Sequence, residues 1–158
     1  MNDDDCWMEA IFYAKVTSWK VRLAKLFSFE SPYVSHVNIR YHFEKPCAGD
    51  LQYEVCITDT GVRIMSPRAA MRHMGDVLYV MPIGRMTLKE CSQAIDDISK
   101  TPLSSVWHQI GWYLGIRRKP PVTCATLVHR VALKIRPDLH KEHLVWPSEL
   151  MDELWRYT

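Results

Sequence analysis

The residues of this chain best suited to chemistry are a cysteine at the start of a predicted helix and a histidine on a distant predicted strand. Cys124 follows Thr123, a good helix N-cap, in the run Val-Thr-Cys-Ala-Thr-Leu-Val. The first-turn N–H groups and the helix dipole stabilise a thiolate at such a position. His36 lies in the run Ser-His-Val-Asn-Ile-Arg-Tyr, on the polar face of its strand. If the two side chains meet in space, they form a cysteine nucleophile with its general base.

Each of these residues also has a plainer interpretation. Cys124 lies three residues before Leu127, on the apolar stripe that packs against the body of the protein. Free cysteine is among the most buried residue types, so Cys124 could be a small buried hydrophobe. A single histidine on a strand is likewise more often structural than catalytic. The catalytic hypothesis therefore depends on whether the fold brings His36 to Cys124.

A nucleophile and base of this kind need a third group that orients the imidazole and fixes its tautomer. Glu54 is the first candidate, because it lies on the polar face of the strand that follows His36, and antiparallel neighbours can meet across the ladder. Asn38, on the same strand face as His36, is the second candidate. For Glu54, a solvated strand position is an equally good explanation.

The elements that must position these residues follow from hydrophobic periodicity and from turn signals. The clearest strand is 34–43, in which Val37, Ile39 and Tyr41 alternate with polar residues. Strands come mostly before helices, which predicts an α+β fold with a small antiparallel sheet packed against helices. The further predicted strands are 10–17, 51–58, 62–65 and 77–81. The predicted helices are 19–27, 87–98, 102–112, one from about 124 to 135, and a last one ending near 155.

Composition limits the classes of function. The 158 residues favour a single domain over 1–158, and 47% hydrophobic residues are typical of a globular protein. A net charge of +2 without a basic aromatic motif gives no reason to expect a nucleic-acid partner. Five cysteines without close pairs indicate free thiols in a reducing compartment. The start of the chain has no signal-peptide pattern and no apolar stretch is long enough to span a membrane, so we expect a cytoplasmic protein without integral membrane association.

Several segments together resemble a known family, the circularly permuted papain-like enzymes. These are the YiiX-like branch of the NlpC-type cysteine peptidases, related to lecithin retinol acyltransferase. The likeness is carried by Glu-Ala-Ile-Phe-Tyr at 9–13, Ser-His-Val-Asn-Ile at 35–39, Tyr-Glu-Val at 53–55 followed by Gly-Val at 61–62, Thr-Cys-Ala-Thr-Leu-Val at 123–128 and Trp-Pro-Ser-Glu-Leu at 146–150. These segments cover most of the chain in the order that is typical of the family.

The resemblance implies a small sheet with the cysteine helix in the C-terminal part of the chain. It also implies a covalent thioester on Cys124, with His36 as the base and Glu54 holding His36. Substrates in such a family are amides or esters: peptidoglycan peptides, other peptide bonds or lipid acyl groups. The chain departs from the family pattern where Glu9-Ala10 replaces Gly-Asp, where Asn38 replaces a glycine, and where Thr126 replaces a glutamate.

The leading hypothesis is therefore a cysteine hydrolase (a peptidase or amidase, with peptidoglycan among its candidate substrates) or an acyltransferase. The alternative is a non-catalytic binding or structural module on the same fold, for example a component of a phage virion or another larger assembly. A zinc site built from His36, His42, Cys47 and Cys56 has suitable residue types but no paired-ligand spacing. We accordingly expect no metal and no other cofactor.

Overall fold

The computed structural model describes residues 5–14, 26, 34–45, 49–58, 60–140 and 143–156. In this part of the chain an antiparallel sheet of five strands has the order β4-β3-β2-β1-β5. The strands are β1 (Asp5–Tyr13), β2 (His36–Lys45), β3 (Gly49–Thr58), β4 (Gly61–Met65) and β5 (Val77–Thr87). The helices are α2 (Pro67–Met74), α3 (Leu88–Lys100), α4 (Val106–Tyr113), α5 (Cys124–Ile135) and α6 (Pro147–Trp155).

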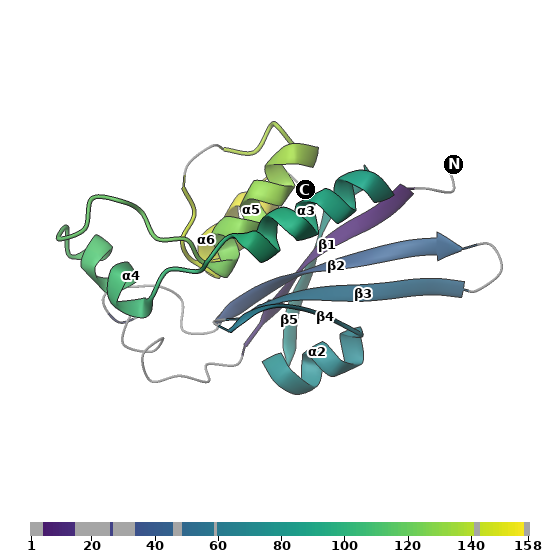
Figure 1. Ribbon diagram of the computed structural model, residues 1–158, viewed down its shortest axis with the longest axis horizontal. Coiled ribbons are helices and arrows are strands. Elements are labelled where there is room, and N and C mark those ends of the chain that lie inside the picture. The colour runs from purple at the N-terminus through teal and green to yellow at the C-terminus, as the bar shows by residue number, and fades with distance from the viewer. Residues whose placement is uncertain are drawn as a thin grey trace.

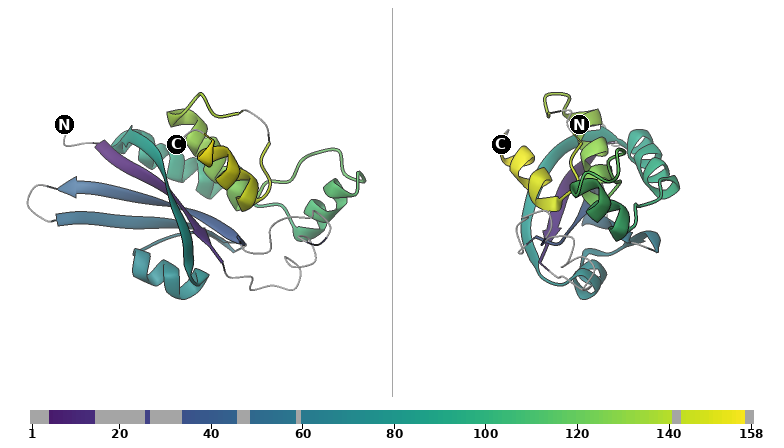
Figure 2. Two further views of the ribbon diagram at one scale, coloured as in Figure 1. Left: turned by 180° about the vertical axis from the view of Figure 1, so that it is seen from behind. Right: turned by 90° about the vertical axis from the view of Figure 1, so that its left-hand side faces the viewer.

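The helices divide between the two faces of the sheet. Figures 1 and 2 show α3, α5 and α6 together on one face and α2 on the opposite face, whereas α4 lies beyond one end of the sheet. α5 contacts β2 and β5, and α2 contacts β3. The α+β class and the antiparallel sheet are therefore as the sequence predicts.

The main hydrophobic core lies between the sheet and the layer of α3, α5 and α6. On β2, Val37, Ile39 and Tyr41 belong to this core, as their alternation in the sequence predicts. On α5, the predicted apolar stripe contributes Leu127, Val128 and Val131. Strand alternation leaves Asn38 and its polar neighbours on the other face of the sheet, the face that α2 partly covers.

Several predicted boundaries are wrong. β1 begins at Asp5 rather than at residue 10, while residues 15–17 of the predicted strand lie outside the described residues. The predicted helix 19–27 also lies outside them, apart from Leu26. β5 continues to Thr87 instead of ending at Pro82, because β5 is an edge strand and Pro82 lies beside a register shift opposite Glu9.

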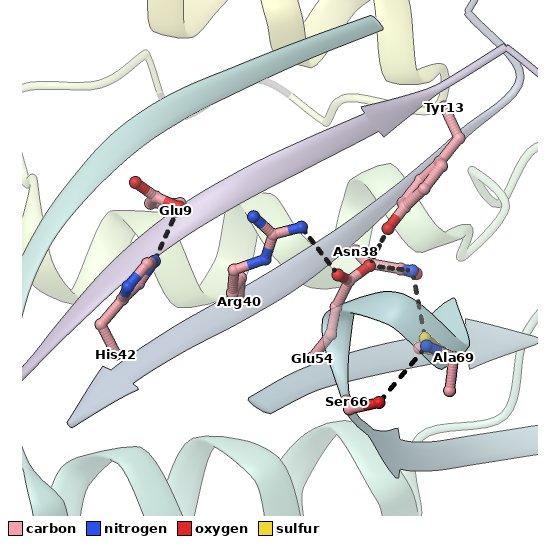
Figure 3. Close-up of polar contacts among 9 residues, drawn as sticks. Glu9, Tyr13, Asn38, Arg40, His42, Glu54, Ser66 and Ala69 are labelled. Atoms are coloured by element: carbon pink, nitrogen blue, oxygen red, sulfur yellow. Dashed lines mark hydrogen bonds and ion pairs between the residues drawn. The ribbon is translucent and has the colours of Figure 1, made fainter. Parts of the chain in front are cut away.

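α2 lies where we predicted no helix from the sequence, but the sequence does carry signals for it. The Ser66 side chain caps it by accepting a hydrogen bond from the backbone N–H of Ala69 at 3.3 Å (Figure 3). Pro67 occupies the first turn, and Gly75, with φ of +89°, follows the last residue. No helix in the described part of the chain has both the length and the apolar character needed to cross a membrane.

Candidate active site

The candidate nucleophile is the first residue of α5, where a doubly bonded cap fixes the backbone. The Thr123 hydroxyl accepts a hydrogen bond from the Thr126 N–H, and the Thr126 hydroxyl accepts one from the Thr123 N–H. Both hydroxyls also donate to the segment before α6, Thr123 to the Val145 carbonyl and Thr126 to the Leu144 carbonyl at 2.7 Å. The start of α5 is thus tied to a segment about twenty residues further along the chain.

The start of α6 holds the same segment from its other side. The Glu149 carboxylate accepts hydrogen bonds from the Val145 and Trp146 backbone N–H groups, at 2.7 and 2.8 Å. Trp146 is buried and packs against Ile110 of α4 in a second, smaller hydrophobic cluster. The position of Cys124 therefore depends on contacts from α4 and α6 as well as on its own helix.

The fold brings the two residues of the predicted pair together. Cys124 is 9% exposed, and its sulfur and the His36 imidazole lie within hydrogen-bonding reach of each other. Burial by itself would raise the pKa of Cys124. The His36 charge, a hydrogen bond from His36 and backbone hydrogen bonds from Val37 and Ala125 outweigh burial, so the pKa of Cys124 is lowered.

The pKa of His36 moves in the opposite direction. Burial alone would lower it. The Cys124 thiolate, the hydrogen bond to that sulfur, a hydrogen bond to Asn38 and the Glu54 charge together raise the pKa of His36 above its ordinary value of 6.5. The two shifts share their main opposing cause to burial, the attraction between a thiolate and an imidazolium. This geometry favours a proton on His36 and a charge on Cys124.

The residue that contacts the other side of the imidazole is Asn38. His36 Nε2 lies 2.8 Å from Asn38 Oδ1, so Nδ1 is the ring nitrogen left for Cys124. Asn38 is fully buried. Its Nδ2 donates to Glu54 Oε1 at 2.8 Å and to Cys56 Sγ at 3.2 Å, and its Oδ1 accepts from the Ile57 backbone N–H at 3.3 Å. The second candidate from the sequence thus occupies the place next to His36.

Glu54 contacts Asn38 and not the His36 imidazole, which the sequence analysis predicts as its partner. Its register partner on β2 is Arg40, four residues along the strand from His36, so the carboxylate reaches Asn38 and not the imidazole. Glu54 is fully buried and also accepts hydrogen bonds from the Tyr13 hydroxyl and from Arg40 Nη2, the latter at 3.2 Å (Figure 3). The carboxylate is therefore surrounded by donors.

Sequence reasoning did not single out Tyr13 as a site residue. The signal lies in the strand register, because Tyr13 is paired directly with His36 across β1 and β2. A tyrosine hydroxyl at the end of one strand can then reach a carboxylate on the polar face of the sheet, and here it reaches Glu54. Register cannot be read from β1 alone, which explains why this contact is visible only in the fold.

Two other described thiols, Cys56 and Cys91, lack the environment of Cys124. Burial and the charge of Glu54 raise the pKa of Cys56 to about 12. A hydrogen bond to Cys6 and burial raise the pKa of Cys91. Cys6, Cys56, Cys91 and Cys124 are all free thiols, and Cys47 lies outside the described residues. Of Cys56, Cys91 and Cys124, only Cys124 has a lowered pKa.

Two other histidines, His42 and His129, lie outside the candidate active site. His42 Nε2 contacts Glu9 Oε2 at 2.8 Å, so His42 forms a separate pair on the same face of the sheet (Figure 3). The helical pattern around His129 predicts a solvated position for this residue, which is wrong. His129 is 4% exposed, and its neighbours include Glu153 of α6 and His140 from the segment before α6.

The proposed zinc ligands do not form a metal centre in the described residues. His36 contacts Asn38, and His42 contacts Glu9. Among the described residues, no group of three histidine, cysteine, aspartate or glutamate side chains could hold a metal ion.

Comparison of the chain with models of protein families, with curated proteins and with solved structures found no match. The chemistry of the site must therefore be argued from its own residues.

Proposed function

We propose that this protein is a cysteine enzyme that cleaves or transfers acyl groups through a thioester on Cys124. The observation that carries the proposal is the contact between Cys124 and His36, in which the thiol pKa is lowered and the imidazole pKa is raised. A thiolate paired with an imidazolium is the reactive state of a cysteine nucleophile. The third member is Asn38, which gives the order cysteine, histidine, asparagine across the site.

The proposed reaction begins with attack of the Cys124 thiolate on the carbonyl carbon of an amide or ester. The resulting oxyanion collapses, the bond to the leaving group breaks, and the His36 imidazolium gives its proton to the departing amine or alkoxide. Neutral His36 then takes a proton from water, or from another acceptor, which attacks the thioester carbonyl. Collapse of this second intermediate releases the acyl product and regenerates the thiolate.

The first turn of α5 is suited to stabilise both oxyanions. The N–H groups at the start of a helix have no partner within the helix, and their dipoles favour negative charge. Cys124 is the first residue of α5, so its own N–H is a candidate donor to the oxygen of a carbonyl bound at its sulfur. The rigid Thr123 cap supports this role by fixing the direction of the turn.

The order of the elements supports a permuted papain-like arrangement as part of the proposal. The histidine strand β2 precedes the cysteine helix α5 in the chain, and α5 packs on β2. The substrate classes are those of the resemblance: peptidoglycan peptides, other peptide or isopeptide bonds, and lipid acyl groups. All present a carbonyl carbon to the thiolate, so the same site chemistry serves each.

Acylation by p-nitrophenyl acetate tests the proposal without knowledge of the natural substrate. We expect a burst of about one p-nitrophenol per chain, and an acetyl group on Cys124 when the product is mapped by mass spectrometry. Cys124→Ala should abolish the burst, and His36→Ala should slow it by about a hundredfold. Glu9→Gln, in the separate His42 pair, should leave it unchanged.

Acetylation spread over several residues, or a burst that survives Cys124→Ala, would overturn the proposal. A positive result would justify a panel of peptide, isopeptide and lipid ester substrates, with water and amines compared as acceptors. A chain that shows no acylation would instead point to the alternative of a non-catalytic module on this fold.

A further inference from the structure

The orientation of the Asn38 side-chain amide is fixed by its neighbours. Nδ2 faces the Glu54 carboxylate, which can only accept hydrogen bonds when ionised, and Oδ1 faces the Ile57 N–H, which can only donate. A flipped amide would set oxygen against carboxylate and N–H against N–H. The environment of Asn38 thus permits one orientation of the two.

This orientation determines which nitrogen of His36 carries the proton. Asn38 Oδ1 is an acceptor and lies 2.8 Å from His36 Nε2, so Nε2 must be the donor. In the neutral imidazole the proton is then on Nε2, and Nδ1 presents its lone pair toward Cys124. A base must have this tautomer to take the thiol proton.

Glu54 is the group that stabilises this orientation of the Asn38 amide. Its Oε1 accepts from both Asn38 Nδ2 and the Tyr13 hydroxyl, and its Oε2 accepts from Arg40 at 3.2 Å (Figure 3). Tyr13, Asn38 and Glu54 are fully buried, so water does not compete for these bonds. The three donors hold the carboxylate still, and the carboxylate in turn holds the amide.

We propose that Glu54 is a positioning residue that acts through Asn38 to fix the tautomer of His36, so that Nδ1 serves as the base for Cys124. This inference rests on the proposed function for its purpose, but the tautomer can be measured without any reaction. It differs from a purely structural role for Glu54, because a structural carboxylate would have no effect on the position of a proton on His36.

The first measurement is the tautomer of His36 in the Cys124→Ala variant, in which no thiolate can protonate the ring. Long-range proton–nitrogen NMR correlations of histidine-labelled protein distinguish the two neutral tautomers. We expect His36 to carry its proton on Nε2 alone. In Cys124→Ala with Glu54→Gln, we expect the Nδ1-protonated tautomer to appear beside the Nε2 tautomer. A neutral amide at residue 54 can offer either a donor or an acceptor to Asn38, and only the Ile57 N–H, at 3.3 Å, then favours the original orientation.

The second measurement is a double-mutant cycle on the pH profile of Cys124 alkylation. Glu54→Gln should lower the alkylation rate at about pH 6 roughly tenfold, which corresponds to a rise of about one unit in the thiol pKa. In an Asn38→Ala background the same change should have a much smaller effect, because only the direct attraction between the Glu54 charge and His36 then remains. Glu9→Gln is the matched control, since Glu9 also contacts a histidine on this sheet face, and its register partner is Arg40 rather than Asn38.

The outcomes separate this inference from the proposed function. His36 with its proton on Nδ1 in Cys124→Ala would overturn the inference, and this result needs no variant of Asn38 or Glu54 to fold. Additive losses in the cycle would also overturn it, since they would mean that Glu54 acts independently of Asn38. The Nε2 tautomer together with failed acylation would reject the function and leave the positioning role intact.

Discussion

At the scale of single residues, Cys124 combines burial with a lowered pKa, and His36 is the reason. Burial raises the pKa of a thiol, and together with the nearby Glu54 charge it raises the pKa of Cys56 to about 12. Cys124 has a lowered pKa because a second charge lies beside it. The difference between these two buried thiols is therefore electrostatic and can be removed by a single substitution.

We expect iodoacetamide to alkylate Cys124 well below the ordinary thiol pKa of about 8.5. The rate should fall only as the pH drops through the lowered pKa of Cys124. His36→Ala removes the imidazolium but leaves most of the burial, so the profile should move to higher pH and the rate at about pH 6 should fall at least roughly tenfold. Mass spectrometry at each cysteine across the pH range measures this.

His42→Ala is the control for that experiment, because His42 pairs with Glu9 elsewhere on the sheet. It should leave the Cys124 profile in place. Equal labelling of Cys56 and Cys124 in the folded protein would contradict the prediction, as would a Cys124 profile that His36→Ala does not move.

At the scale of elements, two helices of this chain carry the same type of cap in different surroundings. Thr123 on α5 and Thr87 on α3 each accept a hydrogen bond from the backbone N–H three residues later. The Thr87 cap is exposed, whereas the Thr123 cap is buried and also bonds the Val145 carbonyl. Comparing variants of these two caps therefore distinguishes a loss of helix stability from a specific effect on Cys124, the first residue of α5.

We expect Thr123→Ala to cost about 2 kcal/mol of unfolding free energy, because it removes a cap and leaves the buried Val145 carbonyl without its donor. The freed turn should also slow Cys124 alkylation. Thr87→Ala should cost about 1 kcal/mol and leave alkylation unchanged. Urea unfolding and the alkylation assay measure the two effects, and equal slowing in both variants would show that the loss is only one of global stability.

The packing of α5 on the sheet requires a glycine in β5. Gly84 has φ of +150°, and a Cβ there would lie 2.7 Å from Ile135 Cγ2. We expect Gly84→Ala to cost about 3 kcal/mol, from backbone strain together with overpacking against α5. Gly61 has φ of +123°, but a Cβ there would meet no atom within 4 Å, so Gly61→Ala should cost only the strain, about 1 kcal/mol.

Urea unfolding of the two glycine variants measures this difference. Similar losses for Gly84→Ala and Gly61→Ala would mean that the close approach of α5 to β5 contributes little to stability.

At the scale of the whole molecule, acid should destabilise the fold partly through His129. Burial lowers the pKa of His129, although a backbone hydrogen bond to His140 and the charge of Glu153 oppose this shift. A histidine with a lowered pKa binds its proton less readily in the folded than in the unfolded state. Its contribution to stability is therefore lost as the pH falls below about 6.5.

We expect His129→Gln to make the unfolding free energy less sensitive to pH between about 7.5 and 5.5. His36 contributes with the opposite sign, because its pKa is raised, and its stabilisation is present below about 6.5 and lost as the pH rises through its folded-state pKa. Urea unfolding at several pH values measures the slope. An unchanged slope in His129→Gln would assign the acid sensitivity to other groups.

Local sequence patterns are enough to define the elements that carry the site. The alternation along β2 assigned Val37 and Ile39 to the core and His36 to the polar face, because side chains alternate strictly along a strand. The threonine before Cys124 identified the start of α5, because capping is a local interaction. These signals act over a few residues and can be read directly from the chain.

Which side chains meet depends on how the strands and helices pack together. The sequence allowed either Glu54 or Asn38 beside His36, and the register of β2 and β3 chose Asn38 by pairing Glu54 with Arg40. The burial of Glu54 and its contact with Tyr13 likewise depend on strands that are far apart in the chain. Register and burial arise from contacts between distant segments, and local sequence patterns do not encode these pairings.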